Sequence, residues 1–182
     1  FFTLWGDDGG YCEYDSALAG LCCAAEMAYG GQEDGERVEK RFRAICDGDY
    51  NAYLVAGDLQ NNDTDNAINA PALLWDDPLL GMYWEDKLID NPQFWDESLS
   101  RYQDILDALS NGENDQSIAH ARHLLNALMA KINAQNALTT AYAQNDKSGL
   151  ANVKDELIPK VIDALTALQE SGAAFLRAKD ED

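Results

Sequence analysis

Hydrophobic residues recur at helical spacing over most of the second half of the chain. From Pro92 onward they form three stripes in which apolar side chains repeat every three or four residues. The stripes run over residues 95–109, 118–142 and 147–176. Pro159 is expected to bend or divide the third. The short links at Asn111-Gly112 and Asn145-Asp146 require antiparallel neighbours, so residues 93–182 are predicted to form a bundle of about three long helices.

The first half of the chain shows shorter helical patterns. Residues 17–29 are strong helix formers, apolar nearly all round, with a cap expected at Asp15 or Ser16 and an end at Gly30-Gly31. Such a helix is expected to be covered on more than one side. Residues 36–46 are amphipathic, and residues 50–56 form a short helical candidate. The amphipathic stretch places Val38, Phe42 and Ile45 at helical spacing.

Two stretches before the bundle lack a regular period. Residues 57–70 are rich in Asn and Asp and are predicted to be an exposed loop. Residues 71–84 are apolar but interrupted by proline and glycine, so they are expected to pack as an ordered loop against a core. Among the tryptophans, Trp75, Trp84 and Trp95 are interpreted as core anchors, and Trp75 or Trp84 is alternatively a candidate to line a ligand-binding site.

The chain begins with a different pattern. Residues 1–5, Phe-Phe-Thr-Leu-Trp, form a short apolar run before the turn signal Gly-Asp-Asp-Gly-Gly, which indicates a buried β-strand and not a secretory leader. No other convincing strand follows, so this one pairs either with a second copy of itself or with a sheet encoded upstream, and we favour the second. The strand, the glycine loop and the helix over 17–29 would form one βα unit, as in parallel α/β folds.

Charge and cysteine usage narrow the class of protein. The 182 residues carry 13 Lys and Arg against 33 Asp and Glu, a formal net charge of -20. So negative a surface repels phosphate backbones and anionic lipid, and we expect neither nucleic acid nor membrane as a partner. The four cysteines form no CxxC pair and no Cys/His cluster, while Cys22-Cys23 in an apolar run is typical of buried thiols. We therefore favour a reducing compartment and a cytoplasmic location.

The densest polar cluster is the loop that follows the predicted strand. Trp5 offers an aromatic face that suits the C–H face of a sugar, and the carboxylates of Asp7 and Asp8 could accept hydrogen bonds from pairs of hydroxyls. The alternative is a tight acidic turn above a buried tryptophan, because turns use the same residue types.

Other candidate sites are weaker. His120 and His123 lie three apart on a predicted helix, without the glutamates of a metal motif. Residues 61–66 resemble the start of a calcium loop but lack its glycine and its final glutamate, so loop filler is the favoured interpretation. No metal and no cofactor is predicted.

A family resemblance adds to this interpretation. The run Thr3-Leu4-Trp5-Gly6-Asp7-Asp8-Gly9-Gly10, followed by Ser16-Ala17-Leu18 and Ala24-Ala25-Glu26, resembles the last barrel strand and following helix of glycoside hydrolase family 20. It is most similar to bacterial exo-β-N-acetylhexosaminidases whose barrel is followed by a helical C-terminal region. Residues 76–81, 138–142 and Asp146 are similar to parts of that region.

The resemblance implies a function for a larger parent protein. Such enzymes remove terminal β-linked GlcNAc or GalNAc by retaining hydrolysis, in which the acetamido oxygen of the substrate attacks the anomeric carbon. Trp5 would be the wall behind the sugar, Asp7 would hold its outer hydroxyls in place of the glutamate of many members, and Asp8 would be an alternative ligand. The catalytic Asp-Glu pair would lie on an earlier barrel strand, so the segment alone is expected to be inactive.

The resulting prediction is a mainly α chain. A helical bundle at 93–182 would follow a helical and irregular connector at 32–92, and residues 1–31 would be the last βα unit of a (β/α)8 barrel. The expected partners are a glycan ending in N-acetylhexosamine and the catalytic barrel, and self-association as a homodimer stays open. The rival hypothesis is a non-enzymatic helical module for protein interaction or structural support.

Overall fold

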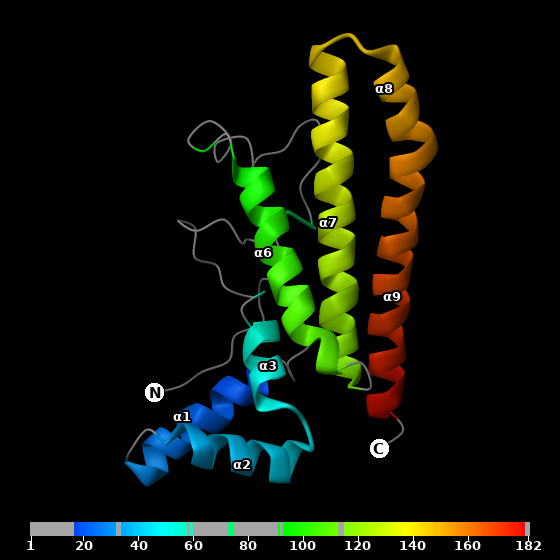
Figure 1. The fold of residues 1–182 in the computed structure, drawn as a ribbon. Coiled ribbons are helices and arrows are strands. Elements are labelled where there is room, and N and C mark those ends of the chain that lie inside the picture. The colour runs from blue at the N-terminus through cyan, green and yellow to red at the C-terminus, as the bar shows by residue number, and fades with distance from the viewer. Residues whose placement is uncertain are drawn as a thin grey trace.

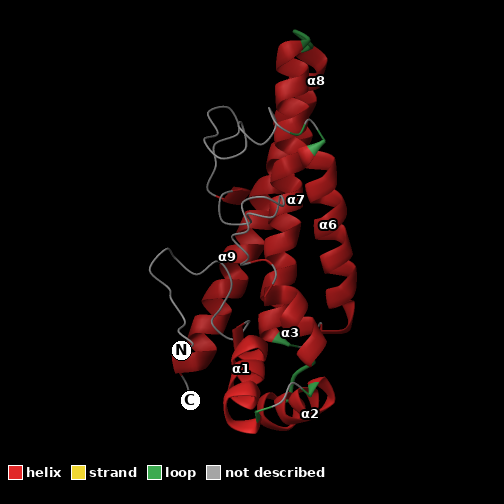
Figure 2. Ribbon diagram, turned by 90° about the vertical axis from the view of Figure 1, so that its left-hand side faces the viewer, coloured by secondary structure: helices red, strands yellow, loops and turns green. Residues whose placement is uncertain are grey.

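A computed structural model describes residues 17–31, 34–57, 59, 73–74, 91, 93–112 and 115–180. Every regular element within these ranges is a helix (Figure 2). The prediction of a mainly α chain is therefore confirmed. The predicted strand at 1–5 and the loop after it lie outside the described residues, so the βα unit stays a prediction.

The predicted bundle of long antiparallel helices is confirmed. Helix α6 covers Phe94–Ala108 and α7 covers Gln116–Ala143. The third member consists of α8 (Lys147–Asn152), a π-helical turn η4 (Val153–Leu157) and α9 (Ile158–Asp180). Figure 1 shows α7 between α6 and α9, and α7 returns into α8 at a tight turn. Helix α7 is thus the central element of the bundle.

Pro159, which was expected to bend or divide the third helix, lies at the second residue of α9, directly after the π turn η4. Proline has no backbone N–H, and in a regular α-helix its ring would clash with the carbonyl of the residue four positions earlier, here Asp155. The structure places the wider π turn immediately before the proline, where Ile158 donates its N–H to the carbonyl oxygen of Val153. The chain therefore stays helical past the proline.

A left-handed residue makes the turn between α7 and α8. Asn145 has φ of 51°, a conformation in which asparagine is better tolerated than most residues. The N–H of Asp146 donates to the carbonyl of Ala141 at 2.9 Å, and the carboxylate of Asp146 accepts from the N–H of Ser148 at 3.0 Å. Both helix ends at this turn therefore have partners for part of their exposed backbone groups.

Gly149 allows α8 to lie close against α7, which leads to a prediction. A Cβ added at Gly149 would lie 2.9 Å from the Cβ of Ala141 and 2.7 Å from Oδ2 of Asp146. The Gly149→Ala substitution should therefore destabilise the chain by about 1–2 kcal/mol, after the gain in helix propensity is subtracted. Chemical denaturation measures this change in the free energy of unfolding.

Gly20→Ala is the matched control for this prediction. No described residue lies within 4 Å of a Cβ added at Gly20 inside α1, so only the helix propensity is expected to change there. This control should stabilise the chain by roughly 0.5–1 kcal/mol. Equal effects at the two glycines would show that α8 does not need the close approach to α7.

Three shorter helices precede the bundle and lie at one end of it (Figure 1). They are α1 (Leu18–Gly30), α2 (Gly35–Cys46) and α3 (Tyr50–Gly57), which match the predicted helical segments within a few residues. The cap of α1 is Ala17, without a side-chain hydrogen bond, and not Asp15 or Ser16 as expected. Asp34 caps α2 by accepting from the N–H of Arg37 at 3.2 Å.

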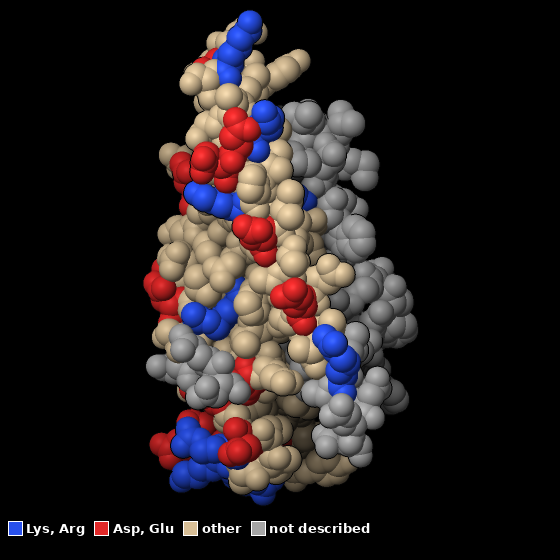
Figure 3. All heavy atoms as spheres, turned by 90° about the vertical axis from the view of Figure 1, so that its right-hand side faces the viewer, with Lys and Arg blue, Asp and Glu red and all other residues tan. Residues whose placement is uncertain are grey.

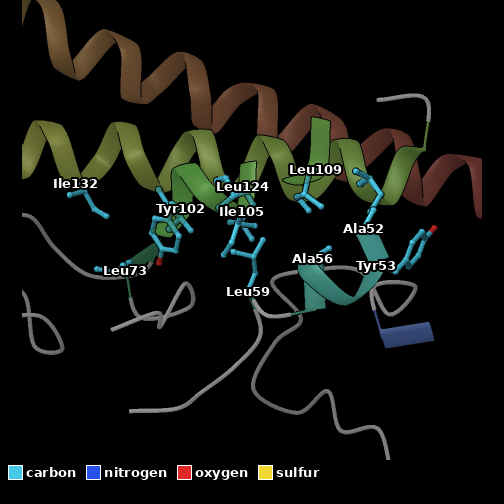
Figure 4. Packing of buried hydrophobic residues seen from close by; sticks show 14 of the residues in the cluster. Ala52, Tyr53, Ala56, Leu59, Leu73, Tyr102, Ile105, Leu109, Leu124 and Ile132 are labelled. Atoms are coloured by element: carbon cyan, nitrogen blue, oxygen red, sulfur yellow. The ribbon is translucent and has the colours of Figure 1, made fainter. Parts of the chain in front are cut away.

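One hydrophobic core joins the three short helices to the bundle. It combines buried residues from α1, α2, α3, α6 and α7 with Leu59 and Leu73, as Figure 4 shows for part of the set. The predicted stripes supply much of it, namely Trp95, Tyr102, Leu109, Ile118, Ala121, Leu125, Leu128 and Ile132. The assignment of Trp95 as a core anchor is confirmed, with 6% of its surface exposed.

The structure corrects three details of the sequence pattern. Ile45 is 78% exposed and Tyr142 is 71% exposed, although both fell on predicted apolar stripes. Each lies near the end of its helix, at a position where the side chain stays open to solvent. Leu59, in the segment predicted to be an exposed loop, is fully buried in the core.

Leu73 agrees with the prediction of a packed segment, since 5% of its surface is exposed and Lys131 donates to the carbonyl of the adjacent Leu74 at 2.8 Å.

Tyr102 carries a buried polar group without a partner, which leads to a second prediction. The residue is fully buried, its hydroxyl has no hydrogen-bond partner among the described residues, and burial raises the pKa of the phenol above its ordinary value. Removing a buried unsatisfied hydroxyl lowers a desolvation cost. Tyr102→Phe should therefore leave the free energy of unfolding unchanged or raise it by up to about 1 kcal/mol. A loss of more than about 1 kcal/mol on denaturation would contradict the lack of a partner.

Candidate functional site

The predicted sugar-binding residues precede α1. Trp5, Asp7 and Asp8 lie outside the described residues, so their assignment stays a prediction. The structure does describe the helix that follows this loop along the chain. Helix α1 begins at Leu18 and ends at Gly30, where Gly31, with φ of 68°, donates its N–H to the carbonyl of Met27. The geometry of α1 is therefore the nearest described constraint on the candidate loop.

A buried ion-pair cluster attaches α1 to α2. Glu26 on α1 is 4% exposed, although it is ionisable. Arg41 on α2 donates from Nη1 to Oε2 of Glu26, and Arg37 holds its guanidinium against Oε1 as an ion pair without hydrogen-bond geometry. The two arginines are about half exposed, so they bring charge to the carboxylate from the solvent side. A carboxylate is tolerated at such depth only when it is paired.

Gly30 makes room for this cluster. A Cβ at Gly30 would lie 3.0 Å from Oε1 of Glu26 and 3.3 Å from Nη2 of Arg37. The absence of a side chain therefore lets the guanidinium reach the carboxylate across the end of α1. In the sequence, Glu26 stood out only as part of the family resemblance, and its pairing with Arg37 and Arg41 was not predicted. The available signal was a single charge in an otherwise uncharged helix, followed by the arginines of α2.

The opposite side of α1 is exposed within the described part of the chain. Leu21 is 40% exposed and Met27 is 48% exposed, and Ala25 is also exposed. The expectation of cover on more than one side is therefore not met by the described residues, which bury Ala19 and Glu26 on one side. The apolar composition read from the sequence is correct, but Leu21, Ala25 and Met27 remain exposed.

The cysteines of α1 and α2 are free thiols, as predicted for the adjacent pair. Cys22, Cys23 and Cys46 are half-buried and not disulfide-bonded, and Cys12 lies outside the described residues. Burial raises the pKa of the Cys22 thiol, and the nearby Cys46 and Glu26 raise it further. A thiol with a raised pKa is a poor nucleophile near neutral pH, so Cys22 is a packing residue here.

Asp115 connects the short helices to α7. Its Oδ1 caps α7 by accepting from the N–H groups of Ser117 at 2.9 Å and Ile118 at 3.4 Å. The hydroxyl of Tyr53 on α3 donates to Oδ2 of the same carboxylate at 2.9 Å. Gly48 leaves space beside both side chains. This contact was also missed from the sequence, where the signal was an aspartate directly before a helical stripe.

The histidines do not assemble a metal site in the described structure. Nδ1 of His120 on α7 lies 3.2 Å from Oγ of Ser171 on α9, and Gly172 packs beside the ring. No group of three or more metal-ligating side chains occurs among the residues that the structure describes. The calcium-like run at 61–66 lies outside them. His120 therefore serves the contact between α7 and α9.

Two Asp-Glu pairs in the described helices, Asp96-Glu97 and Asp155-Glu156, are exposed to solvent. Asp96 and Glu97 are exposed at the start of α6, where Glu97 accepts from the side-chain amide of Asn91 at 2.8 Å. Asp155 and Glu156 are exposed in η4, where Asp155 pairs with Lys154 at 3.1 Å. Among the described residues, neither pair is shown in an ion pair with a basic side chain of another element. None of the described helices has the length and apolarity needed to cross a bilayer.

A comparison with protein families finds a match for most of the chain. The model of the glycoside hydrolase 20C C-terminal domain matches residues 52–174, which extend from α3 through the bundle into α9. No curated protein and no solved structure matches the chain. The matched range covers more than half of the chain and includes most of the described core, so this chain belongs to the glycoside hydrolase 20C C-terminal domain family.

Proposed function

We propose that the chain is the C-terminal segment of a family 20 β-N-acetylhexosaminidase. The parent would remove terminal β-linked GlcNAc or GalNAc by substrate-assisted retaining hydrolysis. The observation that carries the proposal is the family match over residues 52–174. The motif around Trp5 and Asp7 supports it independently, since it lies outside the matched range.

The segment would contribute sugar binding and not the reacting groups. Trp5 would stack against the terminal sugar, Asp7 would accept hydrogen bonds from its outer hydroxyls, and Asp8 would be an alternative ligand. General acid catalysis needs a carboxyl group close to the leaving oxygen. The solvated pairs Asp96-Glu97 and Asp155-Glu156 do not fit that role, so the catalytic pair would come from the barrel, and the isolated chain would be inactive.

The helical domain would support the barrel mechanically. Its core runs without interruption from Ala19 on α1 to Ile132 on α7, and α7 in turn contacts α9. A continuous core keeps its helices in fixed positions relative to one another, because close-packed interiors deform little. The bundle would therefore hold α1, and with it the end of the sugar-binding loop, in a fixed place.

The decisive experiment compares two substrates of the full-length parent. In the proposed reaction the acetamido oxygen is the nucleophile, so p-nitrophenyl β-N-acetylglucosaminide should be hydrolysed and p-nitrophenyl β-glucoside should not. Hydrolysis of both at similar kcat/KM would rule out the substrate-assisted mechanism. Hydrolysis of neither, by a folded parent that also fails on the galacto isomer of the first substrate, would exclude the hexosaminidase assignment.

A non-enzymatic interaction module is the second candidate. It is favoured by exposed apolar side chains on α9, where Ile158, Ile162 and Leu165 are 44%, 57% and 37% exposed. They lie on one side of the helix, at spacings of four and three residues. Figure 3 shows acidic and basic side chains scattered over the face that α8 and α9 share, with uncharged surface between them. A parent without activity on either substrate would favour this function.

A further inference from the structure

Three of the four cysteines lie on the first two helices of the chain. Cys22 and Cys23 are on α1, and Cys46 is the last residue of α2. All three are half-buried free thiols. Cys22 and Cys46 pack against the same hydrophobic core, although they come from different helices. This pair of thiols is not used by the candidate sugar site or by the ion-pair cluster.

The contacts between α1 and α2 show how the two helices are aligned. Helix α2 turns back along α1 after a short link (Figure 1). A Cβ at Gly30 would lie 3.3 Å from Nη2 of Arg37. One turn earlier on α1, Glu26 pairs with Arg41, which lies one turn later on α2. Each turn back along α1 is therefore matched by a turn forward along α2, as in an antiparallel helix pair.

The same alignment brings Cys22 to the level of Cys46. Cys22 lies one turn before Glu26, and Cys46 lies five residues after Arg41. Burial raises the pKa of the Cys22 thiol, and the nearby Cys46 raises it further, so the two sulfurs lie within electrostatic range of each other. A disulfide needs Cα atoms about 4.4–6.8 Å apart, a separation that facing positions on two packed helices provide.

We propose that Cys22 and Cys46 form a thiol–disulfide site, which is closed by exchange with a low-molecular-weight disulfide. The Cys46 thiolate attacks one sulfur of the oxidant, which gives a mixed disulfide and releases one small thiolate. The Cys22 thiolate then attacks the Cys46 sulfur, which forms the Cys22–Cys46 bond and releases the second small thiolate. Two protein thiols lose their protons and are oxidised, and one small disulfide is reduced to two thiols.

The environment of Cys22 sets the order of these steps. Cys46 makes the first attack because the Cys22 thiol, with its raised pKa, is a poor nucleophile near neutral pH. In the second step proximity compensates, since Cys22 is held beside the sulfur that it attacks. The bond would join α1 to α2 beside the ion pairs of Glu26, so the chain would gain stability on oxidation and lose it on reduction.

Equilibration of the 182-residue chain with mixtures of reduced and oxidised glutathione tests the site. Remaining thiols are blocked with iodoacetamide, and the chain is cleaved after Glu, Lys and Arg. Cleavage after Glu13 and Glu26 separates Cys12 from the two thiols of α1, and cleavage after Arg43 releases Cys46 on another peptide. Mass spectrometry should find the peptide 14–26 joined to the peptide that begins at residue 44. The native chain should favour this cross-link at least about tenfold over the same chain unfolded in urea.

Serine substitutions identify the two partners. Cys23→Ser is the matched control, because it removes the neighbouring thiol of α1, and it should keep the cross-link. Cys22→Ser and Cys46→Ser should abolish it. A cross-link that survives in Cys22→Ser would overturn the proposal in favour of Cys23. Pairing through Cys12, mixed disulfides with glutathione alone, or equal cross-linking in the native and unfolded chains would also overturn it.

Thermal unfolding gives an independent readout. The oxidised chain should melt roughly 5–10 °C above the reduced chain, because the bond closes the loop between residues 22 and 46 in the unfolded state. Cys22→Ser should melt at the same temperature in both buffers. A cross-linked chain that melts no higher than the reduced one would mean that the helices must distort to form the bond, which would contradict a site built for it. Neither readout depends on the activity of a parent enzyme.

Discussion

Trp5→Ala in the full-length parent is expected to lower kcat/KM on a β-N-acetylglucosaminide by roughly 30- to 150-fold. A tryptophan face that supports a sugar contributes through apolar burial and the geometry of the ring, about 2–3 kcal/mol when both are lost. If the sugar stacks more tightly as its ring flattens towards the transition state, the substitution lowers kcat and also raises KM. The kinetic constants of the purified variant, measured beside its melting temperature, test this role.

Trp95→Ala is the matched control for this substitution. Trp95 is 6% exposed within the core and packs beside Phe94, with ring centroids 5.0 Å apart. Its loss should lower the free energy of unfolding of the helical domain by about 3–5 kcal/mol. The two substitutions should therefore have different effects. Trp5→Ala should change the kinetic constants, and Trp95→Ala should change the stability. Unchanged kinetics in a stable Trp5→Ala variant would exclude the sugar-wall role.

The long helices were predictable because their burial repeats with the helical period. The stripe through Ile118, Leu125 and Ile132 is buried as the spacing indicated, since neighbouring helices cover α7 on more than one side. The same reasoning failed at Tyr142, which is exposed although Ala141 beside it is buried near Gly149 of α8. Periodicity identifies a face, but the position of the neighbouring element decides which part of that face is covered.

The polar contacts were not predictable from spacing alone. Glu26 meets Arg41 across fifteen positions of sequence, and Tyr53 meets Asp115 across sixty-two. Both contacts depend on how helices cross, which a linear pattern does not encode. The candidate sugar site raises the opposite problem: Trp5 and Asp7 were identified by their residue types and by resemblance, and they lie outside the described residues.

The ion-pair cluster on α1 supports a final prediction. Replacing Arg37 and Arg41 together by methionine should lower the free energy of unfolding of the 182-residue chain by about 3 kcal/mol. The loss arises because Glu26, at 4% exposure, would remain buried without a compensating charge. The expected loss is at the low end of the range for buried ion pairs because the arginines are half exposed. Once they are replaced, a small rearrangement of the Glu26 side chain would let water reach its carboxylate. Urea denaturation followed by circular dichroism measures the change.

Two controls separate the buried charge from other effects of the double substitution. Replacing Lys40 and Arg43 by methionine removes the same charge from the same helix, but both side chains are exposed, and among the described residues Arg43 pairs with the nearby Glu39. That variant should lose less than about 1 kcal/mol. Adding Glu26→Leu to the first variant should restore most of the lost stability, because no buried charge then remains. Similar losses in the two double variants, or no recovery in the triple variant, would mean that Glu26 does not need Arg37 and Arg41 to be buried.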